Sequence, residues 1–346
     1  MNSHRTQTLS APPSLIASLK AGFDAITNHI ALILFPIGLD LLLWFGPHFK
    51  LSRLVEALER QAELLFNGQD PTFDQLLQAN RELWALAAER INLLAALRSY
   101  PVGIPSLMAS ILPVSNPLGA PPVLEVASAL GVGIIWIVAT LIGLAVGALY
   151  FGVVAQAALT NQINWREVWR DWPKASLQVI LLALFWTGLL IAVSIPGSCV
   201  ISLAALGGLT LAQCALLLYL GVLLWIFFPL VFSPHGIFVS GQKMFHSVKT
   251  AVVLTRYTLP NTSLFLLAVI LLSKGLDMLW QVPGETSWLA LVGVAGHAFV
   301  TTGLLAASFI YYRDANRWVQ QMVERMRLSA QLVRNPSNQD DHTPQV

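Results

Sequence analysis

Four ionisable residues interrupt stretches of sequence that are otherwise strongly apolar. Asp40 lies near the end of the first stretch, Lys274 and Asp277 are three residues apart in the fifth, and His297 lies in the sixth. A charged side chain is costly to place in hydrocarbon unless it is paired, so such groups are candidates for ion pairing, proton transfer or substrate binding. Asp40, Lys274, Asp277 and His297 therefore define a candidate intramembrane polar cluster.

The spacing leaves two interpretations of this cluster open. Asp40 and Lys274 are expected at similar depths and can form an ion pair, with Asp277 as a competing partner. We favour a structural clasp over a polar path, because Lys274 can extend to the headgroups and Asp277 can reach water. His297 is expected deeper, where it serves either in a proton relay or, with fewer assumptions, as a hydrogen-bonding partner of a backbone carbonyl or a glutamine amide.

Motifs of enzymes and metal sites are not found along the sequence. It contains no HExxH, no GxSxG, no GxxxxGK[ST] and no paired acidic cluster. The two cysteines, Cys199 and Cys214, lack CxxC spacing. A disulfide between them is conceivable in an oxidising exterior, but we favour two small buried hydrophobic residues. We therefore expect no enzyme, with no catalytic residue, no cofactor and no metal site.

Six apolar windows predict the elements that carry these residues. The chain is 55% apolar and 11% charged, with a mean hydropathy of +0.65. A hydrocarbon core of about 30 Å requires about 20 helical residues, and a backbone in lipid must satisfy its own hydrogen bonds. The predicted fold class is all-α, a polytopic membrane protein with a bundle of six transmembrane helices. The windows are residues 26–45, 123–150, 175–195, 209–232, 262–280 and 288–312.

The distribution of Lys and Arg predicts the orientation. If the N-terminus is cytoplasmic, thirteen of the 20 basic residues fall on the cytoplasmic side, and six of the others lie in one long loop where the positive-inside rule is weak. We therefore expect a cell-membrane protein with a cytoplasmic N-terminus and C-terminus. The thirteen are Arg5, Lys20, Arg166, Arg170, Lys174, Lys243, Lys249, Arg256, Arg313, Arg317, Arg325, Arg327 and Arg334.

Residues 46–122 form the one long segment between windows and are predicted to be extracytoplasmic. Apolar residues recur at helical spacing in residues 51–65 and again in residues 73–95, with a stop at residues 67–68, so an amphipathic helical hairpin is expected. Its two apolar stripes can pack on each other, on the bundle or on a partner protein; we favour packing within the chain. Six prolines in residues 101–122 exclude a regular helix, and we favour a position along the membrane interface over a re-entrant loop.

Several shorter features complete the predicted organisation. Gly143 and Gly147 form a GxxxG motif that predicts close packing within the bundle. Reverse turns are expected around Pro196 and Pro283, and an amphipathic helix over residues 242–257 is expected in the cytoplasmic interface. Residues 1–25 form a cytoplasmic N-terminal segment, and residues 313–346 form a cytoplasmic helix that ends near Arg334 and a disordered tail.

A resemblance covers about a quarter of the chain, residues 227–313. The matching features are the run Phe228, Pro229, Leu230 and Val231, the amphipathic segment 241–257, and the ending 306–314. This stretch resembles bacterial multi-pass membrane proteins akin to the membrane domain of glycerophosphodiester phosphodiesterases. The resemblance implies a six-helix bundle and carries over no catalytic residue, because the soluble phosphodiesterase barrel has no counterpart here.

These observations lead to two functional expectations. The first is a non-enzymatic scaffold or accessory protein that contacts the lipid bilayer, binds no nucleic acid and docks a protein partner through its extracytoplasmic hairpin. The alternative is a small-molecule or lipid transporter that uses the polar cluster in the outer half of the bundle. A transporter requires the four polar residues to line one cavity, whereas a scaffold requires a tightly packed bundle and an apolar patch on the hairpin.

Overall fold

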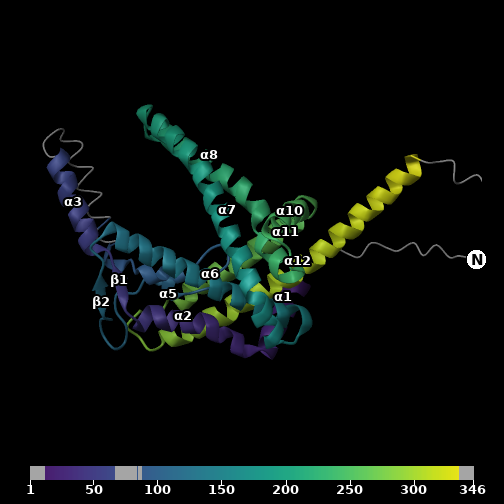
Figure 1. Cartoon of the computed structure of the whole chain (residues 1–346), viewed down its shortest axis with the longest axis horizontal. Coiled ribbons are helices and arrows are strands. Elements are labelled where there is room, and N and C mark those ends of the chain that lie inside the picture. Colours follow the sequence, from purple (N-terminus) through teal and green to yellow (C-terminus); the bar gives the residue numbers. More distant parts are fainter. Residues whose placement is uncertain (1–11, 67–83, 85–87, 335–346) are drawn as a thin grey trace, which may run out of the picture.

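The computed structural model describes residues 12–66, 84 and 88–334, and within them nearly all regular structure is helical (Figure 1). The elements are α1 (Leu15–Asn28), η1 (Ile30–Ile33), α2 (Leu34–Phe45), β1 (His48–Lys50), α3 (Ser52–Phe66), η2 (Leu93–Leu97), α5 (Met108–Ile111), β2 (Val123–Glu125), α6 (Ala129–Thr160), α7 (Trp165–Leu206), α8 (Leu209–Phe227), η3 (Phe228–Leu230), α9 (Ser233–Ser240), α10 (Met244–Tyr257), α11 (Leu259–Trp280) and α12 (Ala290–Arg334).

Five helical stretches in the described residues are long and apolar enough to cross a membrane. A sixth span results if α1 and the helix that follows it are counted together. The predicted all-α, multi-pass class is therefore confirmed. The five stretches are Ala129–Thr160, Trp165–Leu206, Leu209–Ser240, Leu259–Trp280 and Ala290–Ser329.

The first predicted span is not one continuous helix. Residues 26–45 are divided at His29, where the axes of Leu15–Asn28 and Ile30–Phe45 differ by 93°. Pro36 lies in the first turn of α2, where its missing N–H is tolerated, but the same proline cannot donate to a carbonyl four residues earlier. A short 3₁₀ turn precedes α2, and beyond the bend α1 packs against the middle of α12.

The chain reverses between the third and fourth predicted spans later than Pro196 indicated. α7 continues through Pro196 to Leu206, so the predicted turn around Pro196 is wrong. The reversal occurs at Gly207 and Gly208, and Gly208 has a φ of 114° that favours glycine. Membrane helices tolerate proline because local adjustments satisfy the freed backbone groups, so the loss of the one hydrogen bond from residue 196 to Ala192 O does not end α7.

The upper half of α7 and the whole of α8 form an arm, residues 187–227, that stands away from the other helices (Figure 1). α8 has no buried residue, while the two helices contact each other through Ser194 Oγ and Tyr219 OH at 2.7 Å. Cys199 and Cys214 lie on this arm, free and exposed, so the expectation that they are buried is wrong. The apolar surface of the arm is that of helices surrounded by lipid.

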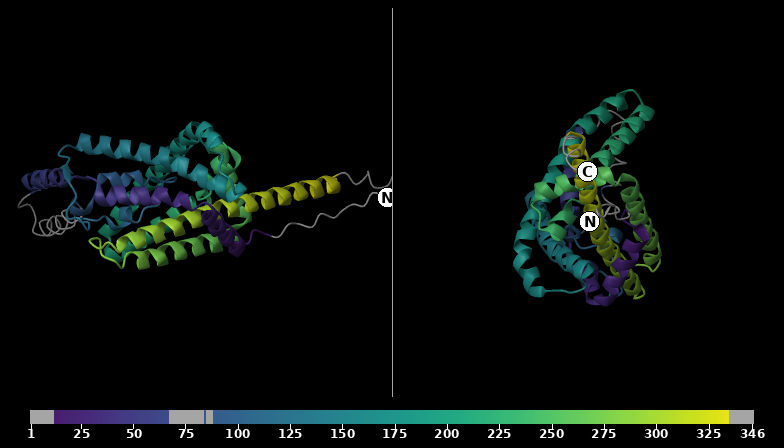
Figure 2. Two further views of the ribbon diagram at one scale, coloured as in Figure 1. Left: turned by 90° about the horizontal axis from the view of Figure 1, so that it is seen from below. Right: turned by 90° about the vertical axis from the view of Figure 1, so that its right-hand side faces the viewer.

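α12 is the central helix of the bundle, and α1 packs against the middle of it (Figure 2). Gly22 of α1 lies directly on the backbone of Ala307, with no room for a side chain between the two helices. Phe265 of α11 stacks on Tyr311 of α12 with ring centroids 4.2 Å apart. These contacts explain why 61% of the apolar window of α12 is buried within the chain.

The proline-rich segment packs against the membrane helices, and its predicted position along the membrane interface stays a prediction. Val102, Leu107 and Met108 are buried in the main core. A side chain at Gly147, in the middle of α6, would lie 2.8 Å from Gly103 Cα, and Gly143 faces the backbone of Leu97. The segment thus lies beside the centre of α6, and the GxxxG motif packs within the chain as predicted.

Parts of the segment between residues 48 and 125 form a small cap on the bundle, which we define as β1, η2, α5 and β2 with the described connections between them other than α3. β1 and β2 pair in parallel, with His48 opposite Val123. The residues of β2 begin the second predicted window. The helix of that window, α6, starts only at Ala129, where the side chain of Ser128 caps it. The strands were not predicted because each has only three residues.

The first helix of the predicted hairpin is confirmed as α3. The second was predicted over residues 73–95, of which residues 73–83 and 85–87 lie outside the described residues. In the described part the helix ends at Arg90, and Asn92 caps the 3₁₀ helix η2 by accepting from Leu94 N at 3.1 Å. The expectation that helix continues to Ala95 is therefore wrong. The predicted amphipathic helix over residues 242–257 and the long final helix are both present, as α10 and α12.

Candidate functional site

Three of the four predicted polar residues form one continuous chain of contacts at the cap end of the bundle. His297 Nδ1 on α12 lies 2.7 Å from Asp277 Oδ1 on α11, and Lys274 Nζ lies 3.4 Å from Asp277 Oδ2. The side chains of His297 and Asp277 are 3% and 8% exposed, whereas that of Lys274 is 62% exposed. The chain therefore runs from an exposed ammonium to a buried imidazole.

Asp40 has other partners, so the predicted ion pair between Asp40 and Lys274 is not formed. Asp40 Oδ1 accepts hydrogen bonds from Ser106 Oγ at 2.5 Å and from Met108 N at 2.9 Å. Ser106 Oγ also accepts from Ala109 N at 2.9 Å, so the carboxylate and the hydroxyl together cap the start of α5. Asp40 is fully buried and holds the proline-rich segment against the bundle.

Asp40 and His297 nevertheless belong to the same buried region. They are close enough to interact electrostatically. Among the described residues neither Asp40 Oδ2 nor His297 Nε2 has a hydrogen-bonding partner, although both atoms are buried. If His297 Nδ1–H donates to Asp277, Nε2 of a neutral His297 is an acceptor, as is Oδ2 of an ionised Asp40, so each of the two atoms needs a donor such as a water molecule or an added proton.

The cap is hydrogen-bonded to the end of α2 and to the connection between α11 and α12. Trp44 Nε1 donates to Glu285 O at 2.9 Å, and Asn116 Nδ2 donates to Trp44 O at 3.2 Å. The carboxylate of Glu285, in the connection between α11 and α12, accepts from Ser115 Oγ at 3.2 Å and from Val114 N at 3.3 Å. The cap and two helix ends therefore form one hydrogen-bonded unit.

α3 extends away from this cap (Figure 1). It is bonded to the cap in its first turn, where Arg53 N donates to Glu125 Oε2 and Ser52 Oγ donates to Ala88 O. Further along, Leu58 is 57% exposed and Leu64 is 87% exposed. Leu58 belongs to the predicted apolar stripe, whereas Leu64 lies about 120° from it around the helix, so the two leucines expose apolar surface on two faces of α3.

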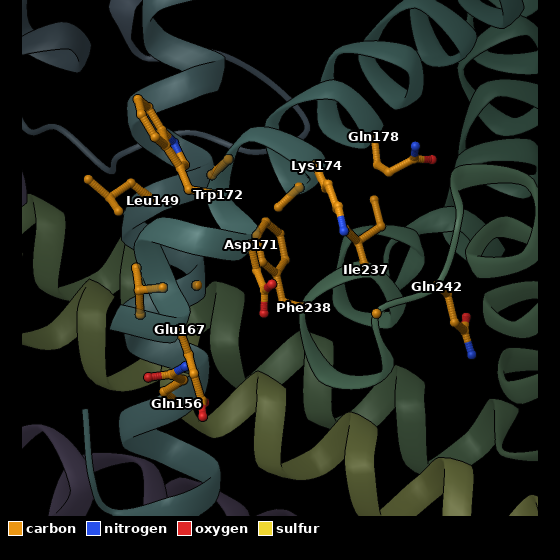
Figure 3. Close-up of a pocket in the computed structure, with 15 residues that line it drawn as sticks. Leu149, Gln156, Glu167, Asp171, Trp172, Lys174, Gln178, Ile237, Phe238 and Gln242 are labelled. Carbon is orange, nitrogen blue, oxygen red and sulfur yellow. The ribbon is translucent and has the colours of Figure 1, made fainter. Parts of the chain in front are cut away.

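A cavity of about 350 Å³ lies near the other end of the bundle, between α6, α7 and α9 (Figure 3). Lys174 and Asp171 of α7 reach toward its centre, and Glu167 lies below them beside Gln156 of α6. The predicted polar cluster does not line this cavity. Its lining residues include Leu149, Gln156, Glu167, Asp171, Trp172, Lys174, Gln178, Ile237, Phe238 and Gln242.

Two glutamines of the cavity have fixed orientations. Gln178 Oε1 accepts from Met244 N at 2.8 Å, and Gln156 Oε1 accepts from Asn164 N at 3.0 Å. Each amide group therefore keeps its NH₂ end for other contacts. One apolar wall is fixed as well, because Trp172 Nε1 donates to Ala145 O at 2.7 Å.

Sequence reasoning placed these cavity residues only in the basic cytoplasmic segment before the third window. The signal that could have found them is the mixture of Glu167, Asp171 and Lys174 within a single helical face at the start of α7. In the described part of the chain, no group of three or more His, Cys, Asp or Glu side chains converges as metal ligands would.

The fold defines the class of this chain as a helical, multi-pass membrane protein with a packed cap at one end. Comparison with known proteins finds no matching family model, no matching curated protein and no matching solved structure. The resemblance of residues 227–313 to the phosphodiesterase membrane domain therefore stays a prediction.

Proposed function

We propose that this chain is a non-enzymatic protein of the cell membrane that docks a partner protein through its extracytoplasmic segment. The observation that carries the proposal is α3, a helix with exposed Leu58 and Leu64, fixed at its base to a cap that is itself bonded to the bundle. A helix held in this way presents apolar side chains to water at a constant position. Its natural complement is the apolar face of an amphipathic helix on another protein.

Site-specific photo-crosslinking in native membranes tests this proposal. A photoreactive residue at position 58 or 64 is expected to give a discrete protein adduct. Leu217 on α8, which is 68% exposed but belongs to the lipid-facing arm, provides the matched control and is expected to give none. Leu58→Glu with Leu64→Glu should abolish the adduct formed from a reactive group at position 54 without lowering the amount of protein. Equal adducts at positions 58, 64 and 217, or none at 58 and 64, would exclude docking through α3.

Transport is a second candidate, favoured by the buried atoms without partners at Asp40 and His297. Two buried titratable side chains, of which His297 is connected through Asp277 to the exposed Lys274, have the composition of a proton-transfer path. In proteoliposomes that contain a pH-sensitive dye, proton flux lost in His297→Gln and retained in Lys274→Gln would favour transport. Absence of flux through the unaltered protein would exclude this path.

A further inference from the structure

The cavity between α6, α7 and α9 lies at the level where apolar helices reach the polar headgroup region. Gln156 is one turn from the end of α6 at Thr160, Glu167 is in the first turn of α7, and Gly241 directly follows α9. Trp165 and Trp169, both about half exposed, flank this end of α7. Tryptophans of this kind mark the interface between hydrocarbon and water.

The cavity is lined by charged groups of both signs, and the ammonium of Lys174 and the carboxylate of Glu167 lie on different sides of it. Figure 3 shows Lys174 and Gln178 on one side of the cavity and Glu167 on the other. The amide of Gln178 keeps its NH₂ group free, so the first side offers an ammonium and an amide donor to an anion. The carboxylate of Asp171 pairs with Arg170, with Arg170 Nε 3.1 Å from Asp171 Oδ1, and lies near Lys174. Glu167 is therefore the carboxylate on the far side of the cavity from Lys174 (Figure 3).

The remaining lining is apolar and continues the surface of the membrane helices. Leu149, Ile237 and Phe238 line it together with Trp172, whose indole is fixed by its hydrogen bond to Ala145. A volume of about 350 Å³ falls in the usual range of small-ligand sites. The site therefore matches a small group that has an anion and a cation and is attached to something apolar.

We propose that this cavity binds the phosphoethanolamine headgroup of an aminophospholipid, with the phosphate near Lys174 and Gln178 and the ammonium near Glu167. A primary ammonium can donate hydrogen bonds to the carboxylate of Glu167, whereas a trimethylammonium cannot, so ethanolamine is preferred over choline. The proposal is independent of docking through α3, because the cavity and α3 lie at opposite ends of the bundle.

Lipid retention by the full chain in detergent, measured by native mass spectrometry, tests the proposal. With lipids of identical acyl chains, the ethanolamine lipid is expected to bind about tenfold more tightly than the choline lipid. Glu167→Gln should remove this preference, and Lys174→Gln should weaken both lipids. Glu324→Gln, on α12 outside the cavity, is the matched control and should change neither. Each variant is first compared with the unaltered protein by its thermal unfolding midpoint.

Soluble phosphoethanolamine distinguishes a lipid from a free zwitterion with the same chemistry. If it displaces the lipid at equal concentration, the site takes the free compound, and if it does not, the acyl chains contribute and the ligand is the lipid; both results support recognition of the headgroup. Equal binding of ethanolamine and choline lipids by the unaltered protein would overturn the proposal. So would an unchanged preference in a folded Glu167→Gln variant.

Discussion

Asp277 joins a buried partner and an exposed one, and the two contacts differ in their importance for stability. Its bond to His297 lies inside the bundle, whereas Lys274 is mostly exposed. Asp277→Ala is expected to cost roughly 3 kcal/mol, because it leaves a buried hydrogen-bonding group without its partner. Lys274→Ala should cost less than about 1 kcal/mol, as for other exposed pairs. Equilibrium unfolding in mixed detergent measures both, and equal losses would contradict this view.

Asp40 provides a separate test, because its partners are Ser106 and Met108. Asp40→Lys should lower the amount of folded protein strongly, since it places an unpaired ammonium in the core. Adding Lys274→Asp should give no rescue, because these two residues are not paired. The measurement is the folded fraction after detergent extraction, compared with Lys274→Asp alone. Recovery in the double variant would instead show that the predicted clasp forms.

His48 in the cap makes stability depend on pH. Burial lowers the pKa of His48 below its ordinary value of 6.5, and the ring nitrogen Nε2 lies 3.1 Å from Leu43 O, which suits a neutral imidazole that donates to the carbonyl. The unfolded chain therefore binds the proton more readily than the folded one. The contribution of His48 to the free energy of unfolding is present above about pH 6.5 and is lost as the pH falls below it. Lys50 acts in the same direction, and Glu285 opposes it.

Hydrogen exchange of the strand amides measures this dependence. Exchange in β1 and β2, corrected for the intrinsic rate, should accelerate as the pH falls below about 6.5. His48→Gln keeps a donor and cannot be protonated in this range, so it should flatten the profile. A profile that is identical in the two proteins would exclude His48 as the cause.

Within α6, glycines that look alike in sequence have different roles. Gly147 lies against Gly103, so Gly147→Ala should destabilise the protein by about 1–3 kcal/mol through overpacking. Gly133 on the same helix has open space around it, so Gly133→Ala should be neutral or stabilise by up to about 1 kcal/mol. Unfolding midpoints of the two variants decide the matter. A loss of equal size at both positions would contradict this difference, because helix propensity favours Ala at each position and only Gly147 has a close neighbour.

Local spacing predicted contacts within helices and failed where a loop determines them. The pairing of Lys274 with Asp277 follows from their separation of three residues on α11. The partner of Asp40, in contrast, is 66 residues away on a proline-rich segment whose path depends on the glycines of α6. No periodicity encodes that path, because the segment has no regular repeat.

Helix ends were predicted least accurately, for the same kind of reason. Pro196 predicted a turn, but α7 continues past it, because a proline removes only one backbone hydrogen bond and the rest of the helix still satisfies its own backbone in lipid. The bend at His29 depends on the packing of α1 against α12, including the close contact of Gly22 with Ala307. The apolar windows established that helices cross the membrane, and contacts between distant segments decide where each helix bends or ends.

The molecule as a whole has two distinct ends, and the proposed orientation places them on opposite sides of the membrane. In a background of Cys199→Ser and Cys214→Ser, Arg60→Cys on α3 should react with a membrane-impermeant maleimide in intact cells. Arg317→Cys on α12 should react only after permeabilisation. Leu217→Cys, on the lipid-facing arm, is the control and should stay unlabelled in both. Labelling of the two arginine positions from the same side would contradict the orientation.

The great length of α12 has a mechanical consequence. With 45 residues and a rise of 1.5 Å per residue, it measures about 68 Å, more than twice the thickness of a hydrocarbon core of about 30 Å. One end begins beside the connection that carries Glu285, and the other projects past the remaining helices (Figure 1). Because of this length, a tilt of α12 by roughly one degree at Ala290 would displace its far end at Arg334 by about 1 Å, so small changes of direction beside the cap become larger displacements at the opposite end.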